Sequence, residues 1–196
     1  GNYVYNSGQM LMSSDDCEEG GGENALYNIT FRNNVFWKTR AMAIIVASMN
    51  DHFSFINNVV AQAWYTGISI SGASHHATVL NNIFYYSGYN NPDQPGGQSL
   101  TDPASEEGSV WDYNLHFPDF SWPPKNPRFD EHGIYGEDPL FMDAAGGDFR
   151  VIGSSPACGA ASDGGDIGAY PCVRCQDDTP VPYFTADRRS GWEPLQ

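Results

Sequence analysis

Basic residues are scarce in this chain of 196 residues. Nine Lys and Arg stand against 24 Asp and Glu, which gives a formal net charge of -15 at pH 7. Nucleic acids and anionic membrane surfaces attract proteins through clustered basic side chains, so this balance argues against both as partners. An anionic polysaccharide is disfavoured for the same reason, unless a divalent cation lies between the like charges.

Long apolar runs are missing as well. No stretch approaches the roughly 20 consecutive apolar residues of a membrane-spanning helix, so we expect no membrane insertion. Apolar residues still make up 40% of the chain and aromatic residues 14%, which is enough for a folded core. With 21 Gly and 13 Pro, the sequence predicts many turns and few long helices.

Cysteines are few: Cys17, Cys158, Cys172 and Cys175. An even number in an acidic, turn-rich chain is typical of disulfides formed in an oxidising compartment, and four cysteines allow three pairings. The spacing of Cys172 and Cys175 is also compatible with zinc, but one CxxC without a second pair is a weak indication. We expect disulfides and leave their pairing open.

What the sequence does contain is a phrase that returns at a fixed interval. Two asparagines followed by apolar residues recur every 24 residues, at 33–34, 57–58 and 81–82. A period between 20 and 50 residues is the signature of repeat architectures. Asn2 and Asn114 head similar tripeptides in the same register.

Each copy of the repeat holds three short apolar runs separated by Asn, Gly or Ser. In one copy they are Ile44–Val46, Phe53–Ile56 and Val59–Ala61. Runs this short, rich in Val, Ile and Phe, predict strands. Three strands in 24 residues leave no room for a crossover helix, so each strand is expected to pair in parallel with its counterpart in the next copy. The predicted fold is all-β, a parallel β-helix of about 24 residues per coil with long turn insertions.

The paired asparagines have two predicted roles. Asn tolerates the left-handed backbone region better than other residues with a side chain, so the pair marks a sharp bend between strands. Asparagines stacked in successive copies also hydrogen-bond as a ladder, which explains their return at one position. The same register predicts that His52 lies over His76, and that Lys38, Gln62 and Tyr86 align.

The segment from Asp138 to Tyr170 resembles the ending of a known family. Its phrases are, in order, DPLF, GDFR, SPA and DIGAY. They are similar to the C-terminal ending of secreted right-handed parallel β-helix proteins related to pectate lyases. The resemblance implies a right-handed helix closed by this segment, an exported protein and often a polysaccharide substrate, with lyase or glycoside hydrolase relatives among the family.

Residues 173–196 are predicted to start a second unit. Pro182–Asp187 and Ser190–Gln196 resemble the opening strand of a PKD-type immunoglobulin-like sandwich, a module that follows catalytic or surface domains in exported proteins. A sandwich needs about 100 residues. We therefore expect residues 1–172 to form the β-helix and residues 173–196 a linker and first strand, within a longer protein that is secreted or at the cell surface.

An acidic insertion at residues 14–25 is the first candidate site. Its crowded carboxylates are Asp15, Asp16, Glu18, Glu19 and Glu23. A hard cation would relieve their mutual repulsion, so bound calcium is one interpretation and a solvated acidic loop is the other. Asp15 and Asp16 also resemble the catalytic aspartate pair of β-helix polygalacturonases, although the other motifs of that family are missing.

A histidine column is the second candidate. His52 and His76 are 24 residues apart, with Asp51 and His75 next to them in the sequence. Imidazoles beside a carboxylate can bind a metal or act as a general base, and the alternative is an ordinary solvated turn.

Cationic and aromatic side chains in another turn are the third candidate. They are Lys38, Arg40, Trp64, Tyr65, Tyr85 and Tyr86. Aromatic faces pack on pyranose rings, and Lys or Arg binds acidic groups, so this set predicts carbohydrate binding. β-Elimination of a uronate needs a base near C5 and a neutralised carboxylate, roles that Lys38 or Arg40 could take. Aromatic residues that merely cover the outside of the fold are the alternative.

Two functions remain open at this point. One is a carbohydrate-associated module of an exported protein, and because the chain shows no complete catalytic set, its status as an enzyme is open. The other is a structural or adhesive module of a surface or matrix protein. Exposed strand edges at the ends of such a module would stack head to tail into a filament or accept a neighbour's strand.

Overall fold

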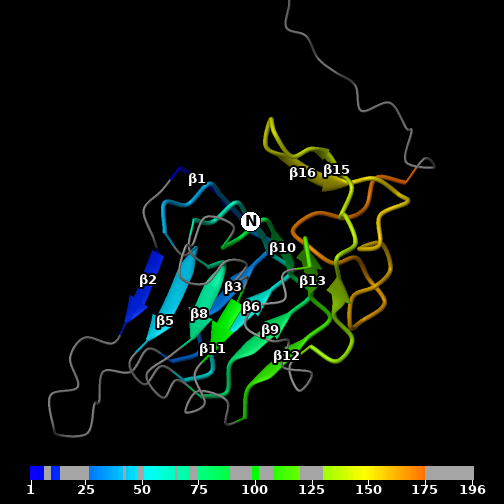
Figure 1. Ribbon diagram of the computed structural model, residues 1–196. Helices are drawn as coiled ribbons and strands as arrows, with labels where there is room; N and C mark the ends of the chain where they lie inside the picture. Colours follow the sequence, from blue (N-terminus) through cyan, green and yellow to red (C-terminus); the bar gives the residue numbers. More distant parts are fainter. Residues whose placement is uncertain are drawn as a thin grey trace, which may run out of the picture.

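A computed structural model of the protein shows an all-β structure (Figure 1). It describes residues 1–6, 10–13, 27–41, 43–47, 51–64, 66–70, 75–88, 99–101, 108–119 and 130–174. These residues contain no helix at all, and hence none with the length and apolar character needed to cross a membrane.

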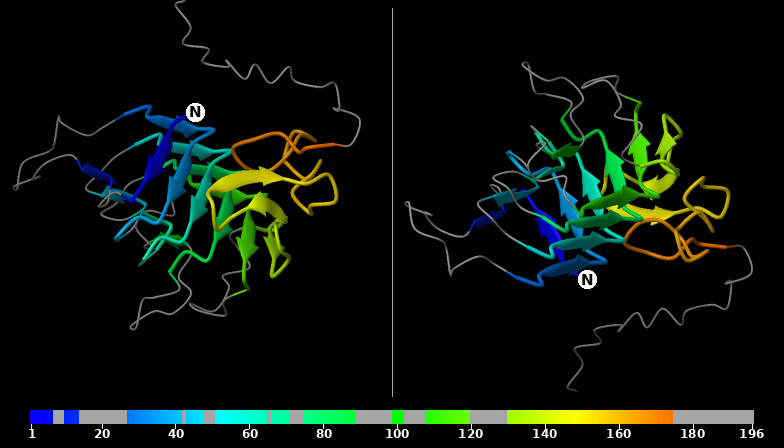
Figure 2. Two further views of the ribbon diagram at one scale, coloured as in Figure 1. Left: turned by 90° about the horizontal axis from the view of Figure 1, so that it is seen from above. Right: turned by 90° about the horizontal axis from the view of Figure 1, so that it is seen from below.

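Three parallel sheets hold the strands β1 to β14 (Figures 1 and 2). Sheet 1 has six strands, in the order β1 (Tyr3–Tyr5), β4 (Val35–Trp37), β7 (Val59–Ala61), β10 (Ile83–Tyr85), β13 (Leu115–Phe117) and β14 (Ile134–Tyr135). Sheet 2 has four strands, in the order β11 (Ser99–Thr101), β8 (Ile68–Ile70), β5 (Ile44–Ala47) and β2 (Met10–Ser13). Sheet 3 has four strands, in the order β12 (Val110–Asp112), β9 (Thr78–Leu80), β6 (Ser54–Ile56) and β3 (Thr30–Arg32). The strands β15 (Phe141–Asp143) and β16 (Asp148–Val151) form a separate antiparallel pair.

The chain passes through the sheets in a repeating cycle. From β3 to β13 a strand of sheet 3 is followed by one of sheet 1 and then one of sheet 2. Phe55 pairs with Phe31 of the copy before it and Val79 of the copy after it. Register is kept where an insertion lengthens a copy, because Ile83 pairs with Leu115. The predictions of an all-β fold and of parallel pairing between copies are confirmed.

The first asparagine of each pair forms the bend between sheets 3 and 1. Asn33, Asn57 and Asn81 have φ values of 58, 52 and 58°. This left-handed conformation is costly for most residues with a side chain and less so for Asn. It turns the chain sharply enough for β6 and β7 to be separated by two residues only.

The second asparagine of each pair is buried and belongs to the predicted ladder. The Asn58 side-chain oxygen accepts hydrogen bonds from the backbone N–H and the amide group of Asn34, at 2.9 and 3.1 Å. Asn58 in turn donates from its backbone N–H and its amide group to the side-chain oxygen of Asn82, at 2.8 and 3.1 Å. The same contacts join Asn2 to Asn34 and Asn82 to Asn114. One buried amide per copy therefore ties each copy to the next.

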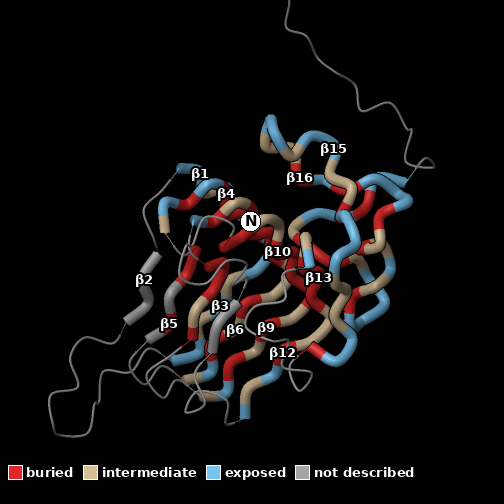
Figure 3. Tube along the Cα trace, in the orientation of Figure 1, coloured by how far each residue is buried: buried red, intermediate tan, exposed pale blue. Residues whose placement is uncertain are grey.

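The middle strands of sheet 1 are buried on both faces of the sheet. Val60 of β7 faces the core between the three sheets, together with Phe36 and Phe84. Val59 and Ala61 on either side of it point outward and are equally buried, against a second apolar cluster. Every residue of β4 and β7 is consequently buried, whereas β6 of sheet 3 buries only its central residue (Figure 3).

The second cluster is supplied by the segment after β14. Residues between Phe141 and Cys172 pack on the outward side chains of sheet 1. Phe149 meets Trp37 edge-on at 5.6 Å between ring centroids, and Asn57 donates a hydrogen bond to the backbone oxygen of Asp166 at 3.1 Å. The resemblance implies that this segment closes one end of the fold. Along the chain, the segment follows β14, the last strand of sheet 1. In space, it lies along the outer face of that sheet (Figure 2).

One disulfide is present in the same segment, between Cys158 and Cys172. The other two cysteines, Cys17 and Cys175, lie outside the described residues, as does the PKD-like stretch. At the end of the described chain, Val173 forms a parallel bridge to Ile152, and Arg174 pairs with Asp166.

Asn58→Ala is expected to lower the free energy of unfolding by about 2–4 kcal/mol, because it leaves buried polar groups of its neighbours without partners. Asn33→Gly is the matched control. Asn33 is exposed at a left-handed bend that glycine adopts freely, so its change should stay within about 0.5 kcal/mol. Urea denaturation measures both variants, and equal losses would contradict the separate roles of the two asparagines.

Candidate functional site

Turn side chains lie in columns, because each turn lies beside the same turn of the next copy. At the turn between sheets 1 and 2, Lys38, Gln62 and Tyr86 are left-handed, with φ values of 52, 56 and 48°. The backbone N–H of Lys38 donates to Ala61 and that of Gln62 donates to Tyr85, one copy further along. The predicted alignment of the three residues is confirmed.

This column lines a surface groove with a volume of about 520 Å³. The groove is lined by Lys38, Thr39, Arg40, Gln62, Trp64, Tyr85 and Tyr86. All but one of the residues predicted from sequence for carbohydrate binding are therefore brought together, and Tyr65 lies outside the described residues. Thr39 also lines the groove, but the sequence did not predict this role. A buried residue between two exposed basic residues has no sequence pattern that marks it as part of a binding site.

The two cations of the groove have no acidic partner among the described residues. The Lys38 ammonium lies 4.3 Å from the centre of the Trp37 ring, and Arg40 donates to the side-chain oxygen of Asn6 at 3.4 Å. Arg150 and Arg174, by contrast, form ion pairs with aspartates. Lys38 and Arg40 thus keep their charge available in a strongly acidic protein.

The aromatic side chains of the groove differ in exposure. The Trp64 residue is 48% exposed, which is high for so large an apolar side chain. Tyr85 and Tyr86 meet edge to face at 4.8 Å between ring centroids. Burial, together with the nearby charge of Asp138, raises the pKa of Tyr85, so its phenol stays protonated and can donate a hydrogen bond.

The histidine column forms as the register predicts, at the turn before sheet 3. The rings of His52 and His76 stack at 4.8 Å with 22° between their planes. Nδ1 of His52 is 3.0 Å and Nδ1 of His76 is 2.7 Å from the same carboxylate oxygen of Asp51. Burial by itself would raise the pKa of Asp51, but the hydrogen bonds from His76 and His52 outweigh it and lower the pKa, so the carboxylate is ionised.

His75 lies next to this column, as the sequence indicates. It forms a parallel bridge with Asp51, and its ring meets the ring of His76 edge-on at 6.3 Å. Nδ1 of His75 is buried, and the described residues provide no hydrogen bond to it.

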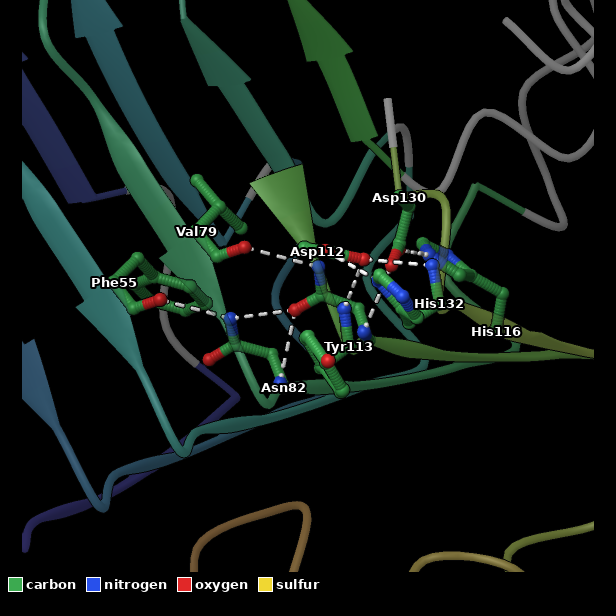
Figure 4. Close-up of polar contacts among 9 residues, drawn as sticks. Phe55, Val79, Asn82, Asp112, Tyr113, His116, Asp130 and His132 are labelled. Carbon is green, nitrogen blue, oxygen red and sulfur yellow. Dashed lines mark hydrogen bonds and ion pairs between the residues drawn. The ribbon is translucent and has the colours of Figure 1, made fainter. Parts of the chain in front are cut away.

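A second histidine–aspartate pair was not predicted from the sequence. His116 takes the inward position in β13 that Phe84 takes in β10, and its ring is stacked between those of Phe84 and Tyr135, at 5.2 and 4.8 Å. Its Nε2 is 2.7 Å from a carboxylate oxygen of Asp130. The other oxygen of Asp130 accepts the backbone N–H of Asn114 at 3.0 Å, which ends the asparagine ladder (Figure 4). The available signal was that His116 follows Asn114 by two residues, as Phe84 follows Asn82.

This buried pair is structural. The His116 and Asp130 side chains are only 9% and 4% exposed, so a ligand in solvent has little access to them. Burial also raises the pKa of Tyr135, which keeps the ring stacked on His116 uncharged. Burying polar groups costs desolvation, and here each side chain provides a hydrogen-bond partner for the other.

A third pair is formed by Asp112 and His132 (Figure 4), with the His132 side chain exposed and that of Asp112 partly buried. His132 approaches Asp112 with both its backbone N–H and its Nδ1, at 2.7 and 2.8 Å, and stacks on Tyr113 at 4.6 Å. Burial would raise the pKa of Asp112, but hydrogen bonds from His132 outweigh it and lower the pKa. The hydrogen bond to Asp112 raises the pKa of His132.

The acidic insertion cannot be placed in this geometry. Asp15, Asp16, Glu18, Glu19 and Glu23 lie outside the described residues. Calcium binding and catalysis by Asp15 and Asp16 stay predictions.

Comparison of the chain with models of protein families, with curated proteins and with solved structures finds no match. Function is therefore inferred from the groove and from the side chains that line it.

The contact between Asp112 and His132 predicts a pH dependence. His132 should titrate above its ordinary pKa of 6.5. Since the pKa of His132 is raised and that of Asp112 lowered, the contact stabilises the fold between roughly pH 4 and 6.5. It is lost as pH rises through the raised pKa of His132, or falls through the lowered pKa of Asp112.

Proton NMR of the imidazole measures this titration directly. Asp112→Asn should return the pKa of His132 toward 6.5, whereas Asp51→Asn, at another turn, should leave it unchanged. An unaltered His132 titration in Asp112→Asn would contradict the assignment.

Proposed function

We propose that this chain is a module of an exported protein and that its groove binds a carbohydrate chain. In this proposal the three sheets are the faces of a right-handed parallel β-helix. The repeated cycle through sheets 3, 1 and 2 supports the β-helix, and the phrases at 138–170 support the right-handed form and the export. Such a scaffold exposes its turns, where ligands are recognised.

The observation that carries the proposal is the exposed Trp64 in a groove that also holds two cations without an acidic partner among the described residues. A half-exposed indole offers an apolar face for the C–H side of a pyranose ring. The groove volume of about 520 Å³ lies within the range of small-ligand sites. Its polar groups, Lys38, Arg40 and Gln62, can hydrogen-bond hydroxyl or acidic groups at the edge of such a ring.

The columns also favour a polymer over a single small molecule. Neighbouring parallel strands are about 4.8 Å apart, so the groove presents a new set of side chains at that interval. Lys38 and Arg40 come from one copy, Gln62 and Trp64 from the next, and Tyr86 from the third. Turn positions that recur at a fixed spacing suit a ligand built of repeating units.

The charge of the groove indicates an acidic sugar. A protein with net charge -15 repels polyanions at long range, so an acidic ligand needs local cations that no carboxylate neutralises. Lys38 and Arg40 meet this requirement among the described residues. If the bound sugar is a uronate, Lys38 and Arg40 are also the candidates for the two roles in β-elimination. Either one would act as the base near C5, or pair with the carboxylate of the sugar.

Backbone strain gives independent support for a function at this turn. Left-handed conformations cost of the order of 1 kcal/mol or more for residues other than Gly and Asn. Asn6 occupies this position in the first copy, yet Lys38, Gln62 and Tyr86 follow it in the next ones. Asparagine would adopt this conformation at a lower cost in free energy. The presence of other side chains here supports a functional role for the surface that they form.

The test is calorimetric titration with short oligouronates and with neutral oligosaccharides of equal length. Trp64→Ala and Arg40→Ala should each weaken oligouronate binding about tenfold, equivalent to about 1.4 kcal/mol. Tyr170→Ala and Arg32→Ala are matched controls, because both residues are exposed and outside the groove. Equal losses in the controls, or no binding of any oligosaccharide, would refute the proposal.

A second readout separates binding from catalysis. β-Elimination produces an unsaturated sugar that absorbs in the ultraviolet, so its appearance with bound oligouronate would show lyase activity. Lys38→Ala should abolish that signal if Lys38 is the base. Binding without product would make the module a carbohydrate-binding one.

A further inference from the structure

The histidine column carries an inference independent of the groove. We propose that Asp51, His52 and His76 bind a divalent transition metal, with Zn²⁺ as the expected occupant. The column lies at the turn before sheet 3, whereas the groove lies at the turn after sheet 1. An experiment that refutes one of the two proposals therefore does not refute the other.

The donor set suits this class of metal. One nitrogen from each ring and one carboxylate oxygen lie within 4.8 Å of one another. Two imidazoles and one carboxylate are a known set of three protein ligands for zinc, with a water as the fourth ligand. Imidazole nitrogen favours zinc, copper and nickel over calcium and magnesium, which prefer all-oxygen sites.

The distances require only small adjustments. Both Nδ1 atoms already converge on one oxygen of Asp51, at 3.0 and 2.7 Å. Zinc bonds of 2.0–2.2 Å at tetrahedral angles separate two ligand atoms by about 3.3 Å. Relative to this oxygen, the His52 nitrogen therefore has to move by about 0.3 Å and the His76 nitrogen by about 0.6 Å, which small shifts of the side chains supply. The side chains of His52, His76 and Asp51 are 46%, 49% and 33% exposed, so the metal and its water enter from solvent.

The rings are also held in place before any metal arrives. On one side, the ring of Tyr27 packs on His52 at 4.9 Å between centroids. On the other side, Gly108 lies under His76, and a Cβ atom at Gly108 would come within 2.3 Å of the His76 ring. Glycine thus leaves the space that the imidazole occupies. Rings fixed in this way lose little freedom on binding, which favours affinity.

Zinc titration of the whole chain tests the inference. Free thiols are first blocked with iodoacetamide, so that Cys17 and Cys175 do not bind the metal, and excess calcium occupies oxygen-only sites. We expect one Zn²⁺ per chain with a dissociation constant in the micromolar range, and Cu²⁺ binding more tightly than Zn²⁺. NMR signals of His52 and His76 should shift on zinc addition.

Asparagine is the substitution that preserves the fold, because Asn28 holds the same place in the preceding copy with φ 57°. His52→Asn and His76→Asn should each weaken zinc binding at least about tenfold, and the double variant should lose it. His132→Asn is the matched control: it removes the surface histidine of the Asp112 pair, which has only one imidazole. It should leave zinc binding unchanged.

Thermal unfolding with and without zinc distinguishes a variant that has lost zinc binding from one that has lost its fold. Zinc should raise the melting temperature of the wild type and of His132→Asn, but not that of the double variant. Wild-type zinc affinity in the double variant, or no bound zinc in the intact chain, would overturn the proposal. In either case the cluster would be a hydrogen-bonded group that needs no metal.

Discussion

A line of buried amide hydrogen bonds holds successive copies of this chain in register. Asn34, Asn58 and Asn82 each accept two hydrogen bonds from the copy before and donate two to the copy after. A slip of one residue would leave all of these groups buried and unpaired, at a cost that the fold could not offset. Because this register is specified so strongly, the side chains of the described turns lie beside their counterparts. Both proposed sites are consequences of that alignment.

Packing on sheet 1 decides which surfaces remain for ligands. The segment from Phe141 to Cys172 covers the outward side chains of β4, β7 and β10, so this face carries no site. The same segment reaches the edge of the groove, where Phe141 meets Tyr85 edge-on at 5.2 Å. It therefore helps to position an aromatic side chain that lines the groove, although it contributes none of the lining residues. Ligand recognition is left to the turns.

Both proposed sites are built on residues with a left-handed backbone conformation, but the side chains at these residues differ in chemistry. At the described turns a left-handed residue begins the change of direction. At the bend between sheets 3 and 1, where no site is proposed, this position is asparagine in three copies and Tyr113 in a fourth. Asn6 is followed by lysine, glutamine and tyrosine at the groove, and Asn28 is followed by two histidines at the column. Residues that adopt this conformation at a higher cost than asparagine are thus the majority at both proposed sites.

The sequence by itself determined the strands, their parallel pairing and the residues that stack. In parallel strands a period of 24 residues places each residue beside its counterpart, so the stacking of His52 on His76 and the alignment of Lys38 with Gln62 follow directly. Tertiary structure decided the pairing of His116 with Asp130, the disulfide between Cys158 and Cys172, and the packing of the last segment on sheet 1. These contacts join residues that no period relates. They depend on which buried polar groups and apolar surfaces remain to be covered once the copies have stacked.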